Sequence, residues 1–140
     1  MIPDPIRTVV GGVIASLAWF VIGGALYMNP LVDKIYKSAD NSAVKEWTSL
    51  PQYLGLMFLG GALAQYTLWA FVFALVEPAL PGGSFLQGIV FGFVLIVVKI
   101  LPRFFDMWIQ TTYPNRKLVV ELINGSIGSF VGGLIFAYVI

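Results

Sequence analysis

The charged residues from Lys99 to Glu121 are those whose spacing could support chemistry. Lys99 and Arg103 are four residues apart and Asp106 follows three later, so a helix would place all three on one face. Glu121 begins a later apolar block and could face them across a bundle. We predict that Glu121 joins the other three in an ionic cluster. A structural salt bridge with interfacial anchoring is the simpler explanation, and a proton or ion relay is the alternative.

Gln65 is a second candidate, because it is a polar residue at the centre of an apolar block. Polar residues inside a membrane cost free energy unless they are paired, so they are default candidates for function. No acidic residue accompanies Gln65 in that block, which makes it a poor ion pathway within one chain. Asn124 can hydrogen-bond across helices and needs no ligand to explain it.

Composition argues against catalysis. The chain has no Cys and no His, which excludes thiol catalysis, disulfides, bis-His haem and the usual zinc, copper and non-haem iron sites. The remaining carboxylates near the expected membrane surfaces are Glu77, Asp106 and Glu121, and Glu77 is expected on the opposite side from the others. We predict that the protein is not an enzyme and uses no metal or cofactor. A lipid-acting enzyme using Asp106 and Glu121 is the alternative in that class.

Apolar blocks of membrane length position these residues. Hydrophobic residues make up 59% of the 140 residues and charged residues 11%, against roughly a quarter charged in soluble domains. The fold class is predicted to be an all-α integral membrane protein, a single transmembrane domain over residues 1–140 with a four-transmembrane-helix bundle. The expected spans are about 8–28, 53–76, 85–101 and 118–140.

The connections carry their own patterns. Residues 29–50 contain apolar Leu31, Val32 and Ile35 opposite Asp33, Lys34 and Lys37 at helical spacing, which predicts a short interfacial helix in the first connection. After the third block, Pro102 is expected to kink or restart the helix. The segment beyond it is expected to be amphipathic and to leave the bilayer at the headgroup level.

Basic residues predict the topology. Seven of the eight Lys and Arg residues lie in or beside connections 29–50 and 102–117, and basic connections stay on the cytoplasmic side. We therefore expect a multi-pass protein of the inner or plasma membrane with both termini outside. The net charge of +1 gives no clustered basic face for nucleic acid, so the basic residues are expected to meet lipid headgroups.

Small residues recur at helical spacing and predict close helix packing. The fourth block has an i+4 series, and the third block has a GxxxG pair: Gly125, Ser129, Gly133 and Ala137, with Gly88 and Gly92. Packing within a four-helix bundle explains these positions. The alternative is that one stripe, above all the one on the fourth block, is a surface for another subunit.

Two stretches carry a family resemblance. Residues 24–31 (GALYMNPL) and 116–125 (RKLVVELING) resemble the end of the first span and the entry to the last span in a family of small four-span bacterial membrane proteins of unknown function. The resemblance implies a four-span fold in a bacterial membrane and implies no reaction.

Together these observations predict a non-catalytic small integral membrane protein. We expect an accessory or scaffold subunit that packs against other membrane helices through its Gly, Ala and Ser stripes. Its expected partners are membrane lipids and either other membrane subunits or itself. The alternative is a small transporter or channel that works as a homo-oligomer, with Gln65 and the glycine-rich helices lining its path.

Overall fold

The computed structural model describes residues 3–39 and 41–140, and every regular element in that part of the chain is a helix. Four helices are long and apolar enough to cross a membrane. They are the first span, Pro5–Tyr27, the second, Leu50–Ala79, the third, Ser84–Gln110, and the fourth, Asn115–Val139. The prediction of an all-α fold with four apolar helices of membrane length is confirmed.

Local sequence sets the ends of the first span. Helix α1 (Pro5–Tyr27) begins at Asp4, whose side chain accepts hydrogen bonds from the first free backbone N–H groups, with proline at the first helical position. It ends before Asn29, which caps the short helix α2 (Pro30–Ser38) by accepting from Val32 N at 3.0 Å. The expected short helix in the first connection is therefore present.

The second span is built from four pieces. Helix α3 (Leu50–Leu56) begins after the Ser49 cap and continues into the π-helix η1 (Met57–Ala64), helix α4 (Gln65–Val76) and the 3₁₀ turn η2 (Glu77–Ala79). The span begins earlier and ends later than the expected 53–76. Its first turn carries Pro51, which lacks the N–H that would be unpaired there.

The third span does not stop at Leu101. Helix α5 (Ser84–Leu95) passes through the π-helix η3 (Ile96–Ile100) into α6, which runs from Leu101 to Gln110. Pro102 lies in the first turn of α6. The π turn before it changes the hydrogen-bond register, so the helix restarts there and then continues.

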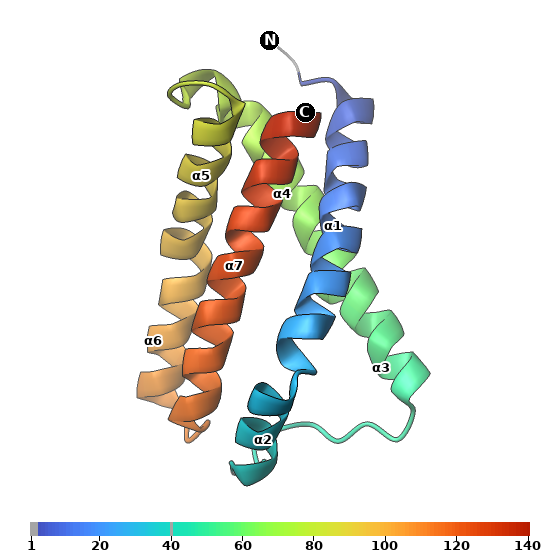
Figure 1. Ribbon diagram of the computed structural model, residues 1–140, viewed down its shortest axis with the longest axis vertical. Coiled ribbons are helices and arrows are strands. Elements are labelled where there is room, and N and C mark those ends of the chain that lie inside the picture. Colours follow the sequence, from blue (N-terminus) through green and yellow to red (C-terminus); the bar gives the residue numbers. More distant parts are fainter. Residues whose placement is uncertain (1–2, 40) are drawn as a thin grey trace.

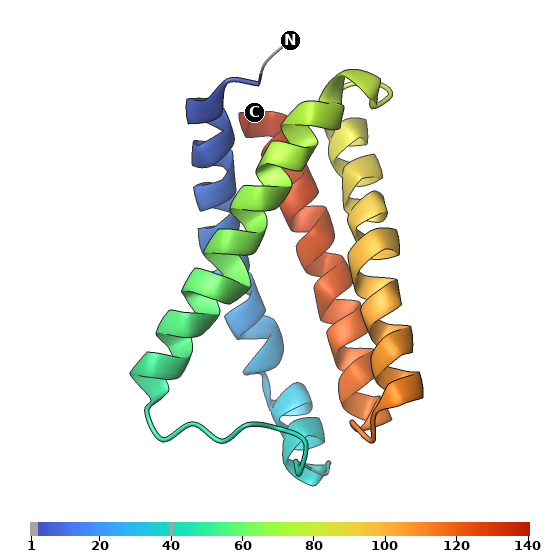
Figure 2. The same ribbon diagram turned by 180° about the vertical axis from the view of Figure 1, so that it is seen from behind.

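The fourth span, α7 (Asn115–Val139), lies between the third span and α1 (Figure 1). The second span crosses behind the other helices in Figure 1 and in front of them in Figure 2; α4 lies close to them, while α3 diverges from α6. Both termini and the α4–α5 turn lie at one end, which we call the terminal end. The other end carries α2 and the α6–α7 connection, and we call it the basic end.

The core lies where the four spans meet. Its fully buried aromatic residues come from three spans: Phe73 is 5.1 Å from Phe91 and 6.0 Å from Phe136 between ring centroids. Tyr66 adds a fourth buried ring, and its hydroxyl donates to the Gly128 carbonyl at 3.0 Å. This packing fixes the rotation of α4 and α7, and with it the direction of their polar side chains.

Candidate functional site

The small-residue stripes lie inside the chain. A Cβ added to Gly133 would lie 2.3 Å from the Gly88 carbonyl oxygen, and one added to Gly92 would lie 2.9 Å from the Phe130 backbone. Ser129 is 4% exposed, while Gly125 faces the Ile100 side chain and Ala137 packs against the core. In this arrangement the stripes bring α5 and α7 together, so the α7 stripe is not a free surface for another subunit.

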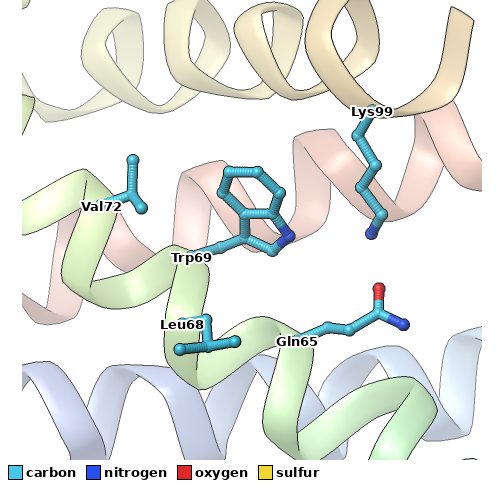
Figure 3. A pocket seen from close by; sticks show the side chains of 5 residues that line it. All are labelled: Gln65, Leu68, Trp69, Val72 and Lys99. Atoms are coloured by element: carbon cyan, nitrogen blue, oxygen red, sulfur yellow. The ribbon is translucent and has the colours of Figure 1, made fainter. Parts of the chain in front are cut away.

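A cavity lies between α4 and η3, at the level where the second span begins to diverge from the third. Its volume is about 370 Å³. Leu68, Trp69 and Val72 give it an apolar wall, and Gln65 and Lys99 are its polar lining residues. In Figure 3 the Lys99 ammonium group and the Gln65 amide point toward the same space from opposite helices.

Lys99 is a cation inside an apolar span. Its Nζ lies 5.8 Å from the centroid of the Tyr66 ring, within cation–π range. Among residues 3–39 and 41–140, no carboxylate forms an ion pair with it. A lysine at the centre of a bilayer costs about 2.5–3.5 kcal/mol on insertion scales, so this position is a candidate for function.

A second polar group lies at the basic end, which we call the basic-end cluster: Tyr36, Asn41, Arg103, Tyr113, Lys117 and Glu121. Lys117 is 1% exposed and donates a hydrogen bond to the Asn41 side-chain oxygen. Its Nζ lies 4.9 Å from the Tyr36 ring centroid and 5.6 Å from that of Tyr113. Two aromatic faces and an amide oxygen therefore surround this buried cation.

Glu121 joins the same cluster from one turn further along α7. Its Oε1 accepts from the Tyr113 hydroxyl at 2.7 Å, and its Oε2 lies 3.7 Å from Arg103 Nη2. Burial, followed by the hydrogen bond to Glu121, raises the pKa of Tyr113 above its ordinary value. Burial likewise raises the pKa of Tyr36, so both phenols are neutral donors at neutral pH.

A larger hollow of about 520 Å³ separates α2 from the start of α7. Its walls are mostly apolar, with Asn115, Arg116 and Asn124 as polar lining residues. The Asn124 Nδ2 atom is buried and makes no hydrogen bond within the described part of the chain.

The predicted ionic set is divided by the fold. Arg103 and Glu121 come together, whereas Lys99 points away toward Tyr66 and Gln65. Asp106 is exposed and forms no ion pair with a described residue. The π turn η3 contains Lys99, and its larger number of residues per turn changes the angle between Lys99 and the residues that follow it.

The sequence did not lead us to predict that Lys117 lies at the centre of the basic-end cluster. The available signal was its spacing from Glu121 and Asn124, four and seven residues, which places all three on one helical face. The aromatic partners Tyr36 and Tyr113 had no such signal, because they come from separate connections. No three Asp or Glu side chains gather to hold a metal ion anywhere in residues 3–39 and 41–140.

Comparison of the chain with protein-family models, with curated proteins and with solved structures finds no match. The resemblance to four-span bacterial membrane proteins therefore stays a prediction.

Proposed function

We propose that this chain is a non-catalytic, multi-pass membrane protein that assembles with a helix of another membrane protein through the basic-end half of its second span. The observation that carries the proposal is the lack of protein cover on α3, none of whose residues is buried. The surface continues onto η1, and we define the second-span surface as Leu56, Gly60 and Ala64, which are exposed and follow one another at four-residue spacing.

Glycine on this surface supports a helix partner. A Cβ added at Gly60 would meet no atom within 4 Å, and the same holds for Gly55. Glycine costs about 1 kcal/mol relative to alanine inside a helix. In membranes that cost is offset where a small residue lets two backbones approach, and no helix of this chain makes such an approach at Gly60.

The π-helix adds a second line of support. Segment η1, Met57–Ala64, covers both small residues of the second-span surface. Short π-helical segments occur frequently at functional sites. The α7 stripe is occupied within the chain, so we assign the partner surface to the second span instead.

Native electrophoresis of cell membranes that are solubilised in mild detergent and probed for the chain tests the proposal, because the partner is then still present. We expect the wild type to migrate above its 15.3 kDa monomer mass, and Gly60→Leu to migrate as a monomer because leucine blocks close approach. Gly24→Leu is the matched control, since Gly24 is also open but lies on α1. A monomeric wild type, or a Gly60→Leu variant that still assembles, contradicts the proposal. If the complex contains only this chain, the partner helix belongs to a second copy of the chain.

The proposed orientation follows from the charge pattern. We infer that the basic end faces the cytoplasm and that both termini and the α4–α5 turn face outside. Support comes from the fold, which gathers α2 and the α6–α7 connection at one end and the termini at the other (Figure 1). Interfacial placement of α2 belongs to the same proposal, since its Asp33–Lys37 ion pair, at 2.7 Å, lies on an exposed face.

Transport by a homo-oligomer is the second candidate function. The observation that favours it is that Gln65 and Lys99 line one cavity within the spans. In this alternative a second copy would complete a polar path around them. A Gln65→Leu variant with unchanged solute flux in liposomes contradicts it, whereas a large loss of flux in a folded variant supports it.

A further inference from the structure

The cavity beside Lys99 has an almost wholly apolar wall, and the side chains of Gln65 and Lys99 border it. The second span runs from the basic end to the terminal end, so Gln65 lies nearer the basic end than Val72 does. The seven-residue step from Gln65 to Val72 rises about 10 Å along the helix. Lys99 faces Gln65 across the cavity (Figure 3), so the polar groups lie on the basic-end side and the apolar wall extends toward the terminal end.

This order matches one kind of membrane molecule. An amphiphile in the leaflet nearest the basic end has its polar group toward that end and its hydrocarbon toward the middle of the bilayer. The ammonium group of Lys99 has no carboxylate partner in the described chain, and Glu121 is already held by Arg103 and Tyr113. The anion of such an amphiphile would supply the ion-pair partner that Lys99 lacks among the described residues.

We propose that this cavity binds a long-chain carboxylate, with the carboxylate paired to the Lys99 ammonium group and its hydrocarbon lying along α4 over Trp69. The Gln65 amide supplies a second hydrogen-bond donor to the carboxylate. The Tyr66 ring, itself fixed by its hydrogen bond to Gly128, holds the lysine in place. This inference does not depend on the assembly proposed above, because the cavity is formed within one chain.

Size and lining favour a carboxylate over a phospholipid headgroup. A bulky headgroup would need more polar partners than the two that line the cavity. The cavity volume, about 370 Å³, falls within the range of small-molecule sites, about 300–1,000 Å³.

Quenching of tryptophan fluorescence by 9,10-dibromostearate tests the proposal, because bromine quenches an indole that it contacts. We expect saturable quenching of the purified full chain in detergent micelles, and loss of most of that quenching in a Trp69→Phe variant. The methyl ester of the same acid carries no negative charge, so it tests the role of the anion on the wild-type chain. It is expected to give no saturable phase, and equal saturation by the ester overturns the proposal.

Variants then locate the anion. Lys99→Met is expected to weaken binding about tenfold or more, because a charge-assisted hydrogen bond is lost, while Lys99→Arg retains binding. Lys34→Met, which removes an exposed cation on α2, is the matched control and is expected to bind as the wild type does. Gln65→Leu serves as a second probe and is expected to weaken binding without removing a charge.

Two further results overturn the assignment. One is equal affinity for the wild type and for a Lys99→Met variant that keeps the helical circular-dichroism spectrum and elution volume of the wild type. The other is Lys99-dependent quenching by dibrominated phosphatidylglycerol in the absence of quenching by dibromostearate, which would assign the site to a phospholipid.

Discussion

At the scale of single residues, the buried Lys117 and the half-buried Lys99 have different surroundings. Lys117 is surrounded by Tyr36, Tyr113 and the Asn41 side-chain oxygen. Lys99 has one aromatic face and an open cavity. A cation with complete partners stabilises a fold, while one with an empty side is available for a ligand. This difference separates a structural cluster from a binding site.

Tyr113 gives the first prediction. Its raised folded-state pKa means that the neutral phenol stabilises the fold fully below its ordinary value of 10.0, and that this stabilisation is lost as the pH rises through the folded-state pKa. We expect the thermal midpoint in detergent to fall above about pH 10. In Tyr113→Phe the thermal midpoint should fall less steeply with rising alkaline pH. At pH 7 this variant should be about 1 kcal/mol less stable than the wild type, since the hydrogen bond to Glu121 is lost.

The measurement is the thermal midpoint by circular dichroism between pH 7 and 12. Glu121 and Arg103 are the charged groups beside this phenol. Tyr36 retains part of the slope in the variant, because burial raises its pKa too. Parallel profiles for the wild type and Tyr113→Phe would show that Tyr113 does not contribute.

At the scale of elements, glycine has two opposite roles in this chain. On α5 and α7 it permits contact between backbones, while on α3 and η1 it faces open space. The sequence pattern is the same in both cases, a small residue every four positions. Only the neighbour distinguishes them, which is why the α7 stripe could not be told from an outer surface by its spacing.

The second prediction compares one substitution at both kinds of position. Gly133→Ala would place a Cβ 2.3 Å from the Gly88 carbonyl oxygen and is expected to lower stability by about 1–3 kcal/mol through overpacking. The Cβ added in Gly60→Ala meets no atom within 4 Å. This substitution should leave the stability unchanged or raise it by up to about 1 kcal/mol, because alanine has a higher helix propensity than glycine. Thermal unfolding of both variants in the same detergent measures the difference. Equal midpoints would contradict the close α5–α7 packing.

At the scale of the whole molecule, the two ends differ in charge and in how closely their helices lie together. The terminal end is drawn together: Arg7 on α1 donates to the Val139 carbonyl at the end of α7 at 3.2 Å, a favourable place for a cation at a helix C-terminus. At the basic end the second span diverges from the third (Figure 2). Both proposed binding surfaces lie on the side of the molecule where that divergence begins.

The third prediction concerns orientation and uses the absence of cysteine. Single cysteines are introduced at Gly83, in the α4–α5 turn, and at Glu46, in the first connection, both of which are exposed. In intact cells a membrane-impermeant maleimide is expected to label Gly83→Cys and not Glu46→Cys, since basic connections stay inside. Lysed cells provide the control, in which both should react. The opposite pattern in intact cells would reverse the proposed topology.

The sequence by itself determined the four apolar helices, the stop at Asn29–Pro30 and the candidate status of Gln65 and Lys99, because length, capping and hydropathy are local properties. The tertiary structure decided which faces meet: it paired Arg103 with Glu121, separated Lys99 from them, buried Lys117 and closed α7 against α5. The physical reason is that lipid is as apolar as a leucine side chain, so hydrophobic patterning identifies a span without saying which side of it packs. That choice depends on close fit between helices, and the fit exists only in three dimensions.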